Sequence, residues 1–104
     1  MGYEEVLVIK PKTEVHPWDV TRYLDSDEAI AAYLDAVLLE NDPALLAAAL
    51  GDVARAKGMT QIARETGLGR ESLYKALSAE GNPELGTVLK VLRSLGLRLR
   101  VSVS

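Results

Sequence analysis

Apolar residues recur at intervals of three and four positions along most of this 104-residue sequence. Such spacing places apolar side chains on one face of an α-helix, so it predicts a mainly α-helical chain. Five helices are predicted, over residues 27–41, 43–58, 59–66, 70–77 and 83–96. The positions expected to face the core are Ile30, Tyr33, Leu34, Val37 and Leu38, then Leu45, Leu46, Leu50, Val53 and Ala54, then Ile62, Ala63, Leu73 and Leu77, and finally Leu85, Val88, Leu89, Leu92 and Leu95.

Residues that favour helix ends mark the boundaries of these segments. Short acceptor side chains cap helix N-termini, proline suits the first helical position, and glycine or asparagine commonly follows the last. Gly51 interrupts the second segment at a cost of about 1 kcal/mol relative to alanine, which favours close packing of another element there. The expected caps are Ser26 or Asp25, Asp42 before Pro43, and Asn82 before Pro83, and the expected ends are Asn41, Gly58 and Gly96.

The two terminal segments have a different pattern, typical of β-strands. Tyr3–Ile9 is rich in valine and isoleucine and Pro11 follows it, which predicts an edge strand or an arm. Leu97–Val103 alternates apolar residues with arginine and serine, which predicts a half-buried strand. Because a single strand is not stable alone, it would pair with the N-terminal strand or, as we favour, with its copy in a homodimer. The expected division is a strand, arm and linker over residues 1–25 and a helical domain with its C-terminal strand over residues 26–104.

Residues 59–77 combine two short predicted helices with a tight turn between them. In the turn, Gly67 can take a positive φ, Leu68 can plug the core and Gly69 adds flexibility. Ala63 is small where the two helices must approach each other. This is the helix-turn-helix pattern, which places its second helix in the major groove of DNA. The alternative is a helical hairpin within a bundle.

The polar residues of this segment determine what it could contact. Arginine at the start of the second helix can bind guanine O6 and N7, and Glu71 can accept a hydrogen bond from a cytosine amino group. The first helix begins with polar residues beside free N–H groups and a positive dipole end, which favours phosphate. The residues expected to contact DNA are therefore Thr60, Gln61, Arg70, Glu71, Tyr74 and Lys75.

Charge is distributed unevenly along the chain. The net charge of −3 is unfavourable for nucleic-acid binding as a total. However, residues 1–50 hold three basic and ten acidic residues, a net of −7, whereas residues 51–104 hold nine basic and five acidic residues, a net of +4. A local basic face matters more for phosphate contact than the total charge. The acidic half favours a second partner with a basic surface, or simply a soluble face.

Composition argues against most other classes of function. There is no cysteine, no apolar run of about 20 residues and no signal-like N-terminus, so we expect a cytoplasmic protein without membrane contact. His16 is the only histidine and has no second ligand or base near it, and the only tryptophan, Trp18, is expected to be a packing anchor. No nucleophile–base pair, glycine-rich phosphate loop or metal-ligand cluster is present. We therefore expect no enzyme, no cofactor and no metal.

Several motifs between Trp18 and Val103 carry a resemblance to a known family. They are YLDSDEAIAAYL, DPALLAAALGDVARAKGMTQIARETGL, RESLYKALSAEGNPELGTVLKVL and LGLRLRV, and the similarity covers over four fifths of the chain. With these motifs the sequence resembles the addiction-module antidote proteins. These are helix-turn-helix antitoxins of the Xre/Cro, lambda-repressor-like fold, similar to HigA-type antitoxins. The resemblance implies a five-helix lambda-repressor-like DNA-binding domain, with the short terminal strands added.

The resemblance also implies partners and contact residues. Its members neutralise a small basic toxin of the RelE/ParE type, and they repress their own operon by binding its operator. Residues Met1–Pro17 extend beyond the usual start of the family, and Gly69 stands where many members have a serine or similar cap. By position, the residues facing DNA would be Gly69, Arg70, Glu71, Ser72, Tyr74 and Lys75, with Thr60 and Gln61 holding the backbone.

Three hypotheses follow from the sequence. The leading one is an antitoxin that is also a transcriptional autorepressor. The second is a toxin-binding module without DNA binding, in which the acidic half contacts the toxin. The third is a stand-alone phage-type transcriptional regulator.

Overall fold

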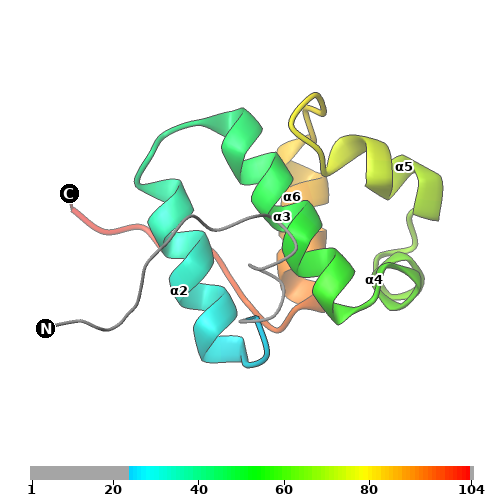
Figure 1. The fold of residues 1–104 in the computed structure, drawn as a ribbon, viewed down its shortest axis with the longest axis horizontal. Helices are drawn as coiled ribbons and strands as arrows, with labels where there is room; N and C mark the ends of the chain where they lie inside the picture. The colour runs from blue at the N-terminus through cyan, green and yellow to red at the C-terminus, as the bar shows by residue number, and fades with distance from the viewer. Residues whose placement is uncertain (1–23, 104) are drawn as a thin grey trace, which may run out of the picture.

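The structure is a computed structural model that describes residues 24–103, and this part of the chain is helical (Figure 1). Its helices are α2 (Asp27–Leu38), α3 (Pro43–Lys57), α4 (Met59–Thr66), α5 (Arg70–Ala76) and α6 (Leu85–Ser94). The mainly α prediction is confirmed, with five helices over residues 24–103. Helix α3 crosses the middle, with α2 on one side and α4 and α5 on the other (Figure 1). None of these helices is long and apolar enough to cross a membrane.

Local capping explains where α2 and α3 begin. The Ser26 hydroxyl accepts a hydrogen bond from the Ala29 N–H at 3.1 Å, so Ser26 rather than Asp25 is the cap of α2. Asp42 accepts from the N–H groups of the second and third residues of α3, at 3.0 and 3.2 Å, and Pro43 occupies the first position. These two starts are confirmed. Helix α2 ends at Leu38, earlier than predicted.

The start of α6 differs from the prediction. The helix begins at Leu85 with Glu84 in the cap position, and not at Pro83 with Asn82 as cap. Pro83 instead lies half-buried along an apolar hollow that Leu85 and Leu99 also line. Tertiary packing of the proline therefore overrides its local preference for the first turn of a helix.

The predicted C-terminal strand is also wrong, because no residue between 24 and 103 belongs to a strand. The Leu97 N–H donates to the Leu92 carbonyl at 2.9 Å, which ties the start of the segment to α6. Beyond it, Val101 and Val103 are fully exposed, at 99% and 101%. A strand needs a neighbouring strand for its backbone hydrogen bonds, and none lies beside it in the described part of the chain. The predicted N-terminal strand, Tyr3–Ile9, lies outside the described residues.

The core forms around α3 and gathers side chains from every helix. Most of the predicted core positions are buried or half-buried. The exceptions lie at the edges of apolar helix faces, where the face is wider than the part that packs against the core. Leu85 is one of them and is 65% exposed. Exposed positions that were predicted for the core are Leu38, Leu45, Leu85 and Leu89, and buried positions missing from the prediction include Ala47, Ala49, Met59 and Val91.

Gly51 is the point where α3 touches the end of α5. A β-carbon built at this glycine would lie 2.1 Å from the Leu77 carbonyl oxygen. Real atoms do not approach so closely, so a hydrogen at this position allows the backbone of Leu77 to pack directly on α3. The close packing predicted at this glycine is confirmed, and it sets the distance between α3 and α5.

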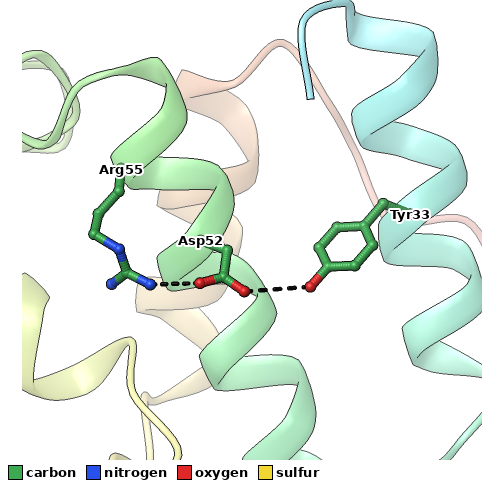
Figure 2. A network of polar contacts seen from close by, with 3 residues as sticks. All are labelled: Tyr33, Asp52 and Arg55. Atoms are coloured by element: carbon green, nitrogen blue, oxygen red, sulfur yellow. Dashed lines mark hydrogen bonds and ion pairs between the residues drawn. The ribbon is translucent and has the colours of Figure 1, made fainter. Parts of the chain in front are cut away.

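A polar network joins α2 to α3 (Figure 2). One carboxylate oxygen of Asp52 accepts the Tyr33 hydroxyl at 3.4 Å, and the other pairs with Arg55. The pKa of Tyr33 is raised above its usual 10.0. Burial is the largest cause, followed by the negative charge of Asp52 and the hydrogen bond to its carboxylate. A second ion pair joins Lys57 and Asp27, at 3.7 Å. These contacts tie α2 to α3 along one side of the molecule.

Candidate nucleic-acid interface

Helices α4 and α5 are joined by the three-residue turn that the sequence predicts. Gly67 ends α4 with φ 74°, and its N–H donates to the Ala63 carbonyl at 3.0 Å. Leu68 is half-buried against the core. Gly69 has the ordinary φ of −66° and precedes α5. The positive φ is therefore confirmed at Gly67, where glycine avoids the steric cost of a side chain.

Thr66 holds this turn together, and sequence analysis missed it. Its hydroxyl donates to the Ile62 carbonyl at 2.8 Å and accepts from the Leu68 N–H at 3.3 Å. One side chain thus satisfies a carbonyl in the last turn of α4 and an amide in the connection to α5. A threonine just before the glycine that ends a helix was the available signal, because threonine hydroxyls commonly bond to the preceding turn.

Helix α5 divides its residues between the core and solvent. Leu73 and Leu77 are each 1% exposed. Helices α4 and α5 run in clearly different directions, and α5 lies at the end of the molecule opposite α2 (Figure 1). Every residue predicted to contact DNA from α5 or from the position before it is exposed. These residues are Gly69, Arg70, Glu71, Ser72, Tyr74 and Lys75.

Arg70 and Tyr74 interact across one turn of α5. The Arg70 guanidinium carbon lies 5.4 Å from the centre of the Tyr74 ring, a cation–π distance. The ring restricts the directions available to the arginine, which begins the helix. Both side chains were predicted as separate DNA contacts, and the structure brings them together.

The start of α5 carries no side-chain cap. Gly69 occupies the cap position, and no side chain accepts from the first amides of the helix. A β-carbon at this glycine would meet the Ser72 hydroxyl at an ordinary 3.6 Å. The serine common in the resembling family would therefore fit here, and its absence leaves these backbone amides to solvent or to a ligand.

Thr60 and Gln61 lie on the exposed side of the first turn of α4. The cap position of α4 is Gly58, again without a side-chain hydrogen bond. The Gln61 amide donates to Glu65 one turn later, at 3.1 Å. A phosphate contact by Gln61 would replace this hydrogen bond, whereas no hydrogen bond within the described residues engages the Thr60 side chain.

The geometry defines a small helical domain that exposes a polar helix pair at one end. The described residues contain no group of three or more side chains suited to hold a metal ion. Residues 14–103 match a family model described as "Probable addiction module antidote protein", and the chain belongs to this family. Membership indicates an antitoxin, whose partner is a toxin.

One relative is similar over most of the chain. An uncharacterized protein of Haemophilus influenzae is 47% identical over 91 residues, which cover 88% of this chain and 94% of that protein. No solved structure matched the chain.

Proposed function

We propose that this protein is an antitoxin that neutralises a RelE/ParE-like toxin and represses its own operon, as a HigA-like member of the Xre group. It acts in the cytoplasm by binding alone, without catalysis, cofactor or metal. The observation that carries the DNA-binding part is the division of α5: Leu73 and Leu77 are buried, and every polar side chain of the helix is exposed. A helix anchored in this way can enter the major groove without unfolding its core.

Each exposed residue has a chemical role in this proposal. Arg70 hydrogen-bonds guanine O6 and N7, and Glu71 accepts from a cytosine amino group. Ser72 and Lys75 bind phosphate oxygens, and Tyr74 directs Arg70. The uncapped amides at Gly69 and the side chains of Thr60 and Gln61 fix the protein on the sugar–phosphate backbone. A homodimer presents two such helices to two half-sites.

The acidic half of the chain supports toxin binding. Its net charge is −7, and three of its carboxylates lie exposed on α2 or just after it: Asp27, Glu28 and Glu40. A small basic toxin would meet complementary charge there, which raises the association rate and disfavours other partners. The DNA-binding helix lies at the other end of the molecule (Figure 1), so one chain can hold both partners.

The experiment is a fluorescence-anisotropy titration on the DNA upstream of the gene, against a scrambled duplex, at two salt concentrations. Arg70→Ala is expected to weaken specific binding by about 1–3 kcal/mol, or about 5- to 150-fold, and to leave the fold intact. Arg93→Ala removes another exposed arginine, from α6, and is the matched control. An operator affinity unchanged by Arg70→Ala would contradict the assignment.

Two other outcomes would select the alternatives. Toxin binding without any specific DNA binding would leave a toxin-binding module. Specific DNA binding with no toxin gene beside this one would leave a stand-alone regulator.

A further inference from the structure

Exposed apolar side chains gather away from the polar helix pair. Tyr74 is the one large apolar side chain of α4 and α5 that is exposed. By contrast, α2, α6 and the segment after α6 expose several, among them Leu38, Leu85, Leu99 and Val101. Contiguous apolar surface of this kind marks an interaction site in a protein that is otherwise well packed.

These side chains border two neighbouring hollows. The first, of about 240 Å³, lies between α2, α3, α6 and the chain after α6, and Leu38, Leu85 and Leu99 line it. The second, of about 390 Å³, lies between α2 and residues 97–100. Leu99 is 42% exposed and lines both hollows, as do Leu34, Leu38 and Leu92. The final residues continue from this surface with Val101 and Val103 in full contact with solvent.

Charge distinguishes the two walls of the second hollow. Asp35 lies on the α2 wall, and Arg98 and Arg100 lie on the opposite wall. A partner of a single charge would meet a like charge on one wall. In a twofold dimer, if residue i of one copy contacts residue j of the other, residue j of the first copy also contacts residue i of the second. The acidic wall of each copy can therefore face the basic wall of the other, with the apolar centres in contact.

We propose that this surface, defined by Leu38, Asp35, Leu85, Leu99, Arg100 and Val101, binds a second copy of the same chain. Val101 and Val103 of each copy pack into the apolar hollow of the other, and Asp35 of each faces the arginines of the other. The contact is made by side chains and needs no strand pairing. It rests on the homodimer of the proposed function, but it forms without DNA or toxin.

The first test is sedimentation equilibrium of the full chain alone, from 1 to 200 µM. The wild type is expected to dimerise, and Val101→Asp to weaken the dimer about a hundredfold, because a carboxylate in each copy would enter an apolar hollow. Ala79→Asp places the same charge on the exposed connection between α5 and α6 and is the control. Val101 makes no buried contact in one chain, so the circular dichroism of Val101→Asp should match the wild type.

The second test uses charge exchange between copies. Asp35→Arg alone, or Arg98→Glu with Arg100→Glu, is expected to weaken the dimer about tenfold, since each homodimer then has two like-charged contacts. An equimolar mixture of the two variants restores opposite charges at both contacts, and its affinity should return toward that of the wild type. Recovery in the mixture supports contact between copies and not within one chain.

Two results would overturn the proposal. One is a wild type that stays monomeric at 200 µM, including the case in which residues 1–23 occupy this surface. The other is a dimer that Val101→Asp leaves unchanged. Neither depends on operator binding, so a failure of Arg70→Ala to affect DNA affinity would count only against the proposed function.

Discussion

The two ends of this molecule expose opposite chemistry. At the α4–α5 end the exposed residues are polar, and the exposed aromatic ring there lies beside an arginine. On the side of α2 and the C-terminal segment, together with the exposed face of α6, the surface carries leucine and valine. Helix α3 packs against α2 on one side and against α4 and α5 on the other, and Leu45 in its first turn is its one exposed large apolar side chain. A chain of this size can therefore keep two binding surfaces apart when a central helix, α3, lies between α2 and the α4–α5 pair (Figure 1).

The largest effect is expected where α3 holds the two ends together. Gly51→Ala should destabilise the protein by about 1–3 kcal/mol, because its methyl group would overlap the Leu77 carbonyl and outweigh the gain in helix propensity. Urea unfolding measures this loss. Because the displaced carbonyl follows α5, operator affinity should also fall, whereas dimerisation at the apolar end should persist.

Gly86→Ala is the matched control for this substitution. It lies within α6, and a β-carbon there would meet no atom within 4 Å. It should stabilise the protein by up to about 1 kcal/mol through helix propensity alone. Equal stability gains from the two substitutions would show that α3 and α5 are less closely packed than described.

Helix starts could be predicted because their causes are local. Asp42 and Pro43 cap and begin α3 with contacts inside four residues, and Gly67 needs only its own backbone conformation. The sequence also signalled close packing at Gly51, but not that Leu77 would be its neighbour. Long-range contacts of this kind have no signature in the periodicity of one segment.

The failed predictions share a dependence on distant elements. The start of α6 moved because Pro83 packs along the apolar hollow, and the C-terminal strand did not form because a strand needs a partner. In the candidate interface, the exposure of Arg70 and Lys75 followed from the burial of Leu73, so the polar face of α5 could be predicted. The stacking of Arg70 on Tyr74 and the role of Thr66 depend on rotamers and hydrogen bonds, which spacing does not specify.

A smaller effect is expected at the polar end, from the turn between α4 and α5. Thr66→Val keeps the volume of the side chain but removes its hydrogen bonds to the Ile62 carbonyl and the Leu68 amide. Unfolding by urea should show a loss of about 1 kcal/mol. Operator affinity should fall as well, because the turn orients α5. Thr60→Val, on the exposed first turn of α4, is the control for stability, and an equal loss in both variants would contradict a special role for Thr66.

The smallest effect is expected on the α2 side and depends on pH. Because the pKa of Tyr33 is raised in the folded protein, the unfolded chain releases the proton first as pH rises above about 10. The contribution of Tyr33 to the free energy of unfolding is therefore fully present below this pH. It is lost as the pH rises through the pKa that Tyr33 has in the folded protein. At neutral pH, Tyr33→Phe should cost less than about 1 kcal/mol, since the hydrogen bond to Asp52 is long, at 3.4 Å.

Above pH 10 the wild type should lose stability relative to Tyr33→Phe, because the variant has no phenol to ionise at this partly buried position beside Asp52. Urea midpoints measured between pH 7 and 11 test this, with Tyr74→Phe as a control that removes a hydroxyl from α5 and leaves the contact between α2 and α3 intact. A constant difference in stability between wild type and Tyr33→Phe across this range would mean that Asp52 and burial do not raise the pKa of the Tyr33 hydroxyl. A loss in the wild type that Tyr33→Phe does not share would locate the pH sensitivity in the contact between α2 and α3, away from the DNA-binding end, and operator binding measured over the same range should then not follow it.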